Sequence, residues 1–237
     1  MRFENFIVDE SNEFAYEVSL SIAEISCIYN PLIIYGDSGC GKTHLINAIK
    51  YAMEEKHGLN VLMTECNDLI ETWIATFKNN ECVDLYDWFK DFDVIIVENI
   101  QDLRGKQSTQ FEVARATCRA VQENKQVVFT SVKPIQGNIF MELEGYLKGR
   151  CPQMVEITIS SPSYELKKQY LEYLMKMEEI ELLEDEQKMI LYNTSTIHQV
   201  RMVLKQAILY SKIKKSTINK EVLLLMLEKE DCEEEKR

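Results

Sequence analysis

The sequence predicts an α/β protein in which helices sandwich a parallel five-stranded sheet, followed by a small all-helical domain. Up to about residue 160, short apolar stretches alternate with stretches of helical periodicity, which is the pattern of strands connected by helices. Beyond residue 160 only helical periodicity remains. Residues 36–43 read G-D-S-G-C-G-K-T and match G-x-x-x-x-G-K-[ST] at every fixed position. This motif stands between a predicted strand and a predicted helix, as the P-loop arrangement requires.

The apolar stretches place the strands and the domain boundary. Residues 93–97 are continuously apolar after the first position, as expected for a central parallel strand buried on both faces. We expect a core domain over 1–160 and a helical domain over 161–237 that ends in an acidic tail. The five predicted strands are 31–35, 61–63, 93–97, 126–130 and 154–159.

Apolar residues at helical spacing predict the helices. Ser163 is a candidate N-cap for the first helix of the second domain. Thr109 and Glu112 have the spacing of a capping box, which predicts a helix that opens at Thr109. The predicted helices are 11–25, 43–55, 67–78, 83–90, 109–123, 163–179, 184–192, 197–213 and 221–230.

Composition narrows the class of protein. A net charge of −12 argues against a strongly nucleic-acid-binding surface, because phosphate neutralisation requires clustered cations. The densest basic run, Lys212 to Lys215, is expected to complement the C-terminal end of a helix. Seven cysteines without a C-x-x-C pair indicate free thiols, and neither a signal region nor an eighteen-residue apolar run occurs. We therefore expect a cytoplasmic protein without a membrane partner.

The residues of the phosphate loop have separable roles. Its three glycines allow positive φ angles, so that successive backbone N–H groups point at an anion. Lys42 is expected to reach the β- and γ-phosphates, and the Thr43 hydroxyl is expected to ligate Mg²⁺. The helix that follows adds its dipole to the site. The predicted phosphate-binding residues are Gly36, Asp37, Ser38, Gly39, Cys40, Gly41, Lys42 and Thr43.

Glu98 and Asn99 follow the central predicted strand. The carboxyl end of this strand is where a P-loop protein anchors its Mg²⁺, so we expect Glu98 to act as a metal ligand together with Thr43.

The predicted helices over 67–90 are rich in aromatic residues. Trp73, Phe77, Tyr86, Trp88 and Phe89 could stack on single-stranded bases. Their helical spacing is also the pattern of a buried apolar face, which is the commoner role. Both interpretations stay open at this point.

At the level of motifs, the chain resembles the AAA+ ATPase module of the bacterial replication initiator DnaA. The resemblance covers nearly the whole chain. The motifs that carry it are Phe3-Glu4-Asn5-Phe6, Tyr29-Asn30-Pro31-Leu32, Gly41-Lys42-Thr43-His44-Leu45, Asn99-Ile100-Gln101, Gly105-Lys106, Thr109-Gln110, Thr130-Ser131 and Pro134.

This resemblance implies an AAA+ core, an initiator-type helical insertion at 67–90 and a helical lid. It implies ATP or ADP with Mg²⁺ as ligands, and it adds Phe6, Val8, His44 and His198 to the nucleotide-binding residues. No N-terminal partner-binding domain or C-terminal helix-turn-helix is recognisable, so we expect no sequence-specific duplex binding. The chain is similar to short stand-alone DnaA paralogues that regulate initiation.

The chain departs from the family pattern at the positions that hydrolyse ATP. Glu98 and Asn99 replace two adjacent aspartates, and a neutral amide cannot take a proton from water as a general base. Val132 replaces the polar sensor-1 residue. His198 replaces the sensor-2 arginine, with Arg201 almost one turn later. Arg150 matches the arginine finger, the residue that this motif supplies to a neighbouring subunit.

Three functions follow as expectations. The first is a nucleotide-dependent switch in replication initiation or its regulation, in which hydrolysis is slow or absent. Such a switch would associate with itself, or with DnaA-type subunits, through Arg150. The second is an active ATPase in which Asp102 or Gln101 replaces the missing base. The third is a helper similar to helicase or transposase loaders, which binds single-stranded DNA weakly through residues 67–90 and the lid lysines.

Overall fold

The computed structural model of the chain describes residues 1–24, 27–78, 84–136 and 140–234. The chain forms two compact units, and each has a hydrophobic core of its own. The first unit contains Met1–Phe6, Asn12–Asp37 and Lys42–Ile159. The second contains Ile7–Ser11, Ser38–Gly41 and Ser160–Arg237.

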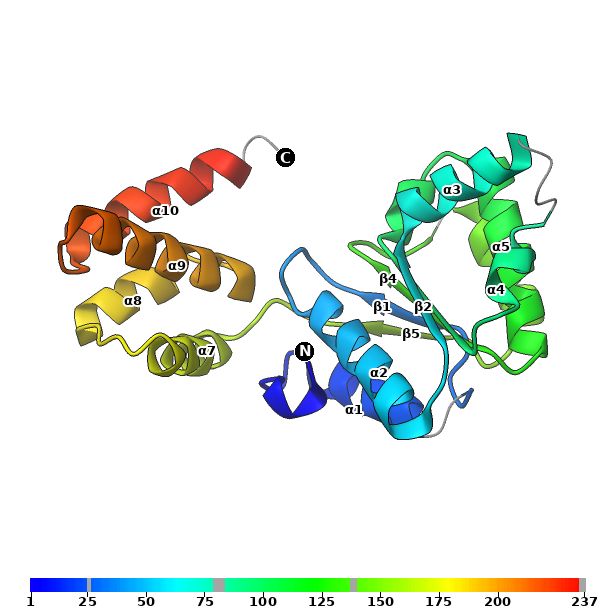
Figure 1. Cartoon of the computed structure of the whole chain (residues 1–237), viewed down its shortest axis with the longest axis horizontal. Coiled ribbons are helices and arrows are strands. Elements are labelled where there is room, and N and C mark those ends of the chain that lie inside the picture. Colours follow the sequence, from blue (N-terminus) through cyan, green and yellow to red (C-terminus); the bar gives the residue numbers. More distant parts are fainter. Residues whose placement is uncertain (25–26, 79–83, 137–139, 235–237) are drawn as a thin grey trace. The chain divides into compact units, whose positions relative to one another are not determined.

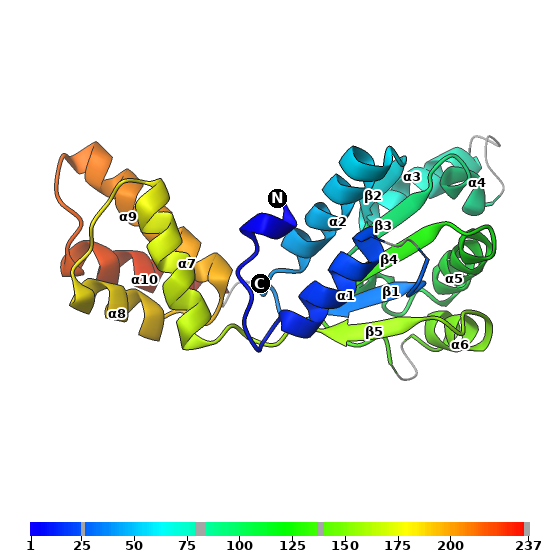
Figure 2. The ribbon, with the colours of Figure 1, turned by 90° about the horizontal axis from the view of Figure 1, so that it is seen from below.

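A five-stranded sheet forms the centre of the first unit (Figure 1), and its strand order is β2-β3-β4-β1-β5 (Figure 2). All neighbouring pairs are parallel, which confirms the predicted parallel sheet. Since β4 lies between β3 and β1, the carboxyl ends of β3 and β1 flank the end of β4 at one edge of the sheet. The strands are β1 (Leu32–Tyr35), β2 (Val61–Glu65), β3 (Val94–Glu98), β4 (Gln126–Ser131) and β5 (Val155–Thr158).

Helices cover both faces of this sheet (Figure 2). Alternate side chains of a strand point to opposite faces. Ile33, Ile95 and Phe129 accordingly belong to the core under one helical layer, whereas the equally buried Ile34 and Ile96 point to the other face. One layer contains α1 (Glu13–Glu24) and α2 (Lys42–His57), and the other contains α3 (Cys66–Lys78), α4 (Tyr86–Phe89), α5 (Gln107–Gln122) and α6 (Met141–Arg150).

The aromatic insertion contributes to the core of the first unit. Tyr86 and Phe89 on α4 are buried, and Trp73 and Trp88 pack against the same core while partly exposed. The buried-face interpretation is therefore confirmed for Tyr86 and Phe89, whereas Trp73 and Trp88 are only partly buried. The side chain of Phe77 lies outside the described residues.

Helix α5 begins earlier than the capping box predicted. It starts at Gln107, Lys106 holds the cap position, and no side chain caps the helix, so the prediction of an opening at Thr109 is wrong. The buried Gln110 side chain donates from Nε2 to the Leu103 carbonyl at 2.9 Å. This tertiary anchor fixes the helix start where the local cap signal does not.

The sequence analysis missed helix α6. Its two interior glycines weaken the helical signal, and only Leu143 and Leu147 on it are buried. Packing against α5 stabilises it: Cys118 Sγ on α5 lies 3.2 Å from Cys151 Sγ, just beyond α6. This helix matters because Arg150 is its last residue.

The second unit contains α7 (Tyr164–Met177), α8 (Glu184–Tyr192), α9 (Ile197–Lys214) and α10 (Lys220–Glu234). Ser163 caps α7 as predicted, since its Oγ accepts from Leu166 N at 3.0 Å. Lys212 and Lys214 lie in the last turn of α9, where cations complement the helix dipole.

The last helix ends later than the predicted residue 230. Helix α10 continues to Glu234, so the first part of the acidic segment is helical, and residues 235–237 lie outside the described residues. Across the described part of the chain, no helix combines the length and the apolar character needed to cross a bilayer.

Candidate phosphate-binding site

The phosphate loop connects β1 to α2. Its three glycines have φ angles of 155° (Gly36), 78° (Gly39) and 116° (Gly41), and the last two lie in the region that strongly favours glycine. Helix α2 starts at Lys42, so its N-terminal N–H groups follow the loop directly. The backbone conformation is the one that the motif predicted.

The Lys42 side chain is only 8% exposed. Its ammonium donates to the carbonyl oxygens of Gly36 at 2.5 Å and Asp37 at 2.8 Å. An arriving phosphate would offer charged acceptors in place of these neutral carbonyls, and hydrogen bonds to ionised acceptors are the stronger ones.

Thr43 and Glu98 meet between α2 and β3. The Thr43 hydroxyl donates to Glu98 Oε2 at 2.9 Å. Burial raises the pKa of Glu98, the negative charge of Glu65 adds to this rise, and the Thr43 hydrogen bond and Lys42 oppose it. A divalent cation suits such a site, because it accepts oxygen ligands and favours the ionised carboxylate. The two predicted metal ligands are thus brought together.

Asn99 follows β3 in the left-handed conformation, at φ 60°. Its Nδ2 donates to Glu65 Oε2 at 2.7 Å, and its Oδ1 accepts from Gln101 Nε2 at 3.1 Å. Gln101 Oε1 in turn accepts from Val132 N at 3.2 Å. We call Glu65, Asn99, Gln101 and the Val132 amide the strand-edge cluster.

Glu65 was not identified from the sequence as a site residue. It is the last residue of β2, and the register pairs it with Glu98 across β2 and β3. A glutamate shortly after each of two predicted strands, 61–63 and 93–97, was the available signal. Asp102, a predicted substitute base, instead accepts from Asn67 Nδ2 at 2.6 Å.

Two further predicted residues, Phe6 and His44, contact each other. Their ring centroids are 5.1 Å apart in an edge-on arrangement, and His44 Nε2 lies 3.0 Å from the Arg2 carbonyl oxygen. Burial lowers the pKa of His44. Val8, by contrast, is 38% exposed and belongs to the second unit.

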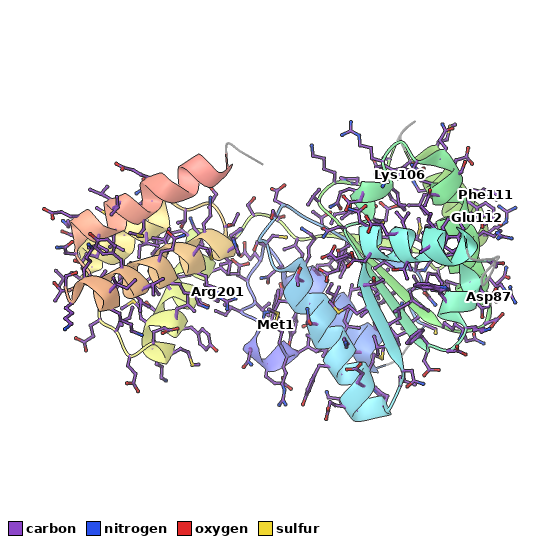
Figure 3. All side chains as sticks on the ribbon, turned by 45° about the horizontal axis from the view of Figure 1, so that its top comes forward. Met1, Asp87, Lys106, Phe111, Glu112 and Arg201 are labelled. Atoms are coloured by element: carbon purple, nitrogen blue, oxygen red, sulfur yellow. The ribbon has the colours of Figure 1, made fainter. Side chains whose placement is uncertain are left out.

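Within the second unit, the loop residue Gly39 lies close to the start of α9. A Cβ added at Gly39 would lie 2.8 Å from His198 Cβ and 3.1 Å from Thr196 Oγ1. Close approach and positive φ thus both require glycine at this position. Arg201 projects from α9 and is exposed (Figure 3).

Arg150 ends α6 and is exposed. Its guanidinium carbon lies 3.9 Å from the centre of the Tyr146 ring, which is a cation–π arrangement. This contact holds the guanidinium at the surface of the first unit, and its predicted role toward a neighbouring subunit stays a prediction.

A cavity of about 610 Å³ lies between α3, α5 and α6. Phe111 and Glu112, both on α5, form part of its wall (Figure 3). Its lining consists of Trp73, Ile74, Gln107, Ser108, Thr109, Phe111, Glu112 and Glu142.

The parallel sheet, the glycine-rich loop before α2 and the helical second unit define a P-loop nucleotide-binding domain of the AAA+ class. More specifically, the chain belongs to the bacterial DnaA ATPase domain family, whose sequence profile matches residues 1–158. The resemblance inferred from the motifs is therefore confirmed.

Relatives agree with this assignment. The chromosomal replication initiator protein DnaA of Borrelia turicatae (strain 91E135) is 33% identical over 167 residues, which are 70% of this chain and 34% of that protein. The chain thus spans about a third of the length of this relative.

Solved structures of DnaA share the fold. Domain III of DnaA from Thermotoga maritima matches with a TM-score of 0.86 at 24% identity, over 96% of this chain and 95% of that one. AMPPCP-bound DnaA from Aquifex aeolicus matches with a TM-score of 0.77 at 26% identity, over 90% and 65% of the two chains. A structure of the replication initiator DnaA bound to AMPPCP and single-stranded DNA matches with a TM-score of 0.76 at 26% identity. The match covers 86% of this chain and 63% of that one.

Proposed function

We propose that this protein is a nucleotide-dependent switch of the DnaA type, which acts in replication initiation or its regulation. It binds ATP or ADP with Mg²⁺ and hydrolyses ATP slowly or not at all. One observation carries the proposal: the phosphate loop is complete, whereas the position after Glu98 holds an amide engaged in hydrogen bonds to Glu65 and Gln101.

The binding half of the proposal rests on the loop and its neighbours. Lys42 supplies the point charge, and Thr43 and Glu98 supply hard oxygen ligands of the kind that Mg²⁺ prefers. When bound, the ion neutralises charge on the β- and γ-phosphates. Two DnaA structures that match at 26% identity contain the ATP analogue AMPPCP, which supports an adenine nucleotide as the ligand.

The hydrolytic half rests on Asn99 and Val132. An amide can orient a water but cannot accept its proton, and losing a general base costs about 10²–10⁴-fold in rate. Val132 has no polar side chain for the γ-phosphate, and its amide N–H already donates to Gln101. Nucleotide binding without rapid turnover suits a switch, because the bound state then persists.

In the switch that we propose, Phe6, Val8, His44 and His198 respond to the nucleotide, and Arg150 reaches the nucleotide of a second copy or of a DnaA-type subunit. The surface position of Arg150 at the end of α6 supports this role. Arg150→Ala should abolish ATP-dependent association in sedimentation velocity, whereas Lys148→Ala, which removes a cation paired with Glu144, should not. Equal association of both variants contradicts the role of Arg150.

Nucleotide titration and phosphate release together test the main proposal. A fluorescent ATP analogue should bind with Mg²⁺, and phosphate release should stay far below the roughly 10 s⁻¹ typical of enzymes. Asn99→Asp should raise the rate at least tenfold, because it returns a carboxylate to this position. A wild-type turnover near 10 s⁻¹, unchanged by Asn99→Asp, would establish the alternative of an active ATPase.

Single-stranded DNA is a second candidate ligand. Trp73 and Phe111 line the cavity beside α5, and a relative was solved with AMPPCP and single-stranded DNA. Glu112 and Glu142 also line this cavity, and carboxylates repel a phosphate backbone, so we expect weak binding.

Titration of a labelled oligothymidine with and without ATP checks this candidate. Binding should weaken steeply with salt, and Phe111→Ala should weaken it further, since stacking contributes about 1–3 kcal/mol per base. The exposed Phe14→Ala is the matched control, because Phe14 lies on α1 in the opposite helical layer. Absence of binding at low salt excludes this function.

A further inference from the structure

In the strand-edge cluster, the Glu65 carboxylate lies next to Asn99, whose side chain is a neutral amide. Glu65 ends β2, its register partner Glu98 ends β3, and Glu65 Oε2 accepts from Asn99 Nδ2 at 2.7 Å. Glu65 and Asn99 are 34 positions apart in the chain and meet only because β2 and β3 are parallel neighbours. The carboxylate therefore lies beside position 99 instead of at it.

We infer that Glu65 is the general base for the slow ATP hydrolysis of this protein, with Asn99 orienting the attacking water. This inference rests on the proposed function, because it requires ATP bound at the phosphate loop. It replaces the two substitute bases that the sequence suggested, Asp102 and Gln101.

The hydrogen bonds of the neighbouring groups favour Glu65 over these two. Gln101 is a neutral amide, bonded to Asn99 and to the Val132 amide. The Asp102 carboxylate accepts from Asn67 Nδ2 on α3, and the Asp102 backbone N–H donates to the Asn99 carbonyl at 3.0 Å. Glu98 is held by the Thr43 hydroxyl, where a metal ligand is expected.

The direct bond between Asn99 and Glu65 also suggests how a water is held. Asn99 Oδ1 accepts from Gln101 Nε2, while Asn99 Nδ2 donates to Glu65. Glu65 is exposed and has carboxylate lone pairs beyond the one that Asn99 uses. A water that enters between the two side chains would therefore be positioned by the amide and the carboxylate together, with the carboxylate as the proton acceptor.

The reaction balances with water as the only co-reactant. The water oxygen forms a bond to the γ-phosphorus, and the bond from this phosphorus to the β,γ-bridging oxygen breaks, so that its electron pair leaves with ADP. The water proton passes to the Glu65 carboxylate and then to solvent. Lys42 stabilises the negative charge on the phosphate oxygens.

Glu65→Gln tests the inference without removing the hydrogen bond, because the glutamine Oε1 still accepts from Asn99 Nδ2. We expect the rate at saturating ATP to fall about 10²-fold or more, with unchanged nucleotide affinity. Adding Asn99→Asp to Glu65→Gln should restore hydrolysis.

Two variants are matched controls. Glu71→Gln makes the same change at an exposed position on α3, and Asp102→Asn removes the competing carboxylate. Both should keep the wild-type rate. A Glu65→Gln rate equal to wild type, a loss in Asp102→Asn instead, or a wild-type rate no higher than that of Lys42→Ala overturns the assignment of Glu65. A failure of wild-type protein to bind nucleotide would instead overturn the proposed function itself.

Discussion

The phosphate loop and the strand-edge cluster are built in different ways. The loop is one contiguous stretch, whose backbone angles at Gly39 and Gly41 and whose Lys42 contacts within the loop are local. The strand-edge cluster is assembled from the Glu65 side chain at the end of β2, the Asn99 and Gln101 side chains just after β3 and the Val132 amide just after β4, which meet only in the folded sheet. Under the proposed function, nucleotide binding and nucleotide cleavage would therefore depend on separate parts of the site and could change independently.

Lys42→Ala should have the largest effect, because it removes the only ammonium that the phosphate loop itself contributes. Affinity for ATP and ADP should fall about 100-fold or more, since hydrogen bonds to charged groups contribute about 1.5–3 kcal/mol each. Titration with a fluorescent nucleotide measures this loss. The control is Lys50→Ala on the same helix, whose ammonium lies 3.8 Å from Glu54 at the surface. Equal affinities of the two variants contradict the role of Lys42.

Glu98→Gln should separate metal-dependent from metal-independent binding. With excess Mg²⁺, ATP affinity should fall about tenfold, equivalent to about 1.4 kcal/mol, because a neutral amide is a weaker metal ligand. With EDTA, affinity should not fall, since the variant removes a negative charge close to the phosphates. Nucleotide titrations of wild type and variant, each with Mg²⁺ and with EDTA, measure these affinities. An equal loss of affinity under both conditions would argue against a metal ligand at this position.

The same substitution should make the nucleotide-free protein more stable at neutral pH. The folded-state pKa of Glu98 is raised above its ordinary value of 4.5. The stability that its protonated form contributes is fully present below about pH 4.5 and is lost as pH rises through the raised pKa. Glu98→Gln should therefore melt at a higher temperature than wild type at pH 7, and this difference should shrink at acidic pH. A constant difference across this range would refute the assignment.

Gln101→Leu should have the smallest effect. It removes the acceptor of the Val132 amide and the donor to Asn99, at a cost of about 1 kcal/mol in the free energy of unfolding. Nucleotide affinity should stay unchanged, because no loop residue is altered. Urea unfolding beside nucleotide titration checks both statements, and a loss of affinity would show that the strand-edge cluster also supports binding.

Local signals in the sequence were sufficient for much of the fold. The P-loop motif predicted positive φ angles at Gly39 and Gly41, and apolar runs predicted strands such as β3. Ser163 was a correct cap because capping is decided within one helical turn. Signals that compete with distant contacts were less reliable, as the start of α5 and the omission of α6 demonstrate.

The sequence by itself determined the phosphate loop, the pairing of binding residues with an altered hydrolytic position, and the family. These are properties of contiguous residues and of residue identity. Only the tertiary structure decided that Glu65 lies beside Asn99 and that Gln101 connects Asn99 to the Val132 amide. The physical reason is strand order: parallel pairing of β2, β3 and β4 brings three carboxyl ends to one edge, and no local pattern encodes which strands become neighbours.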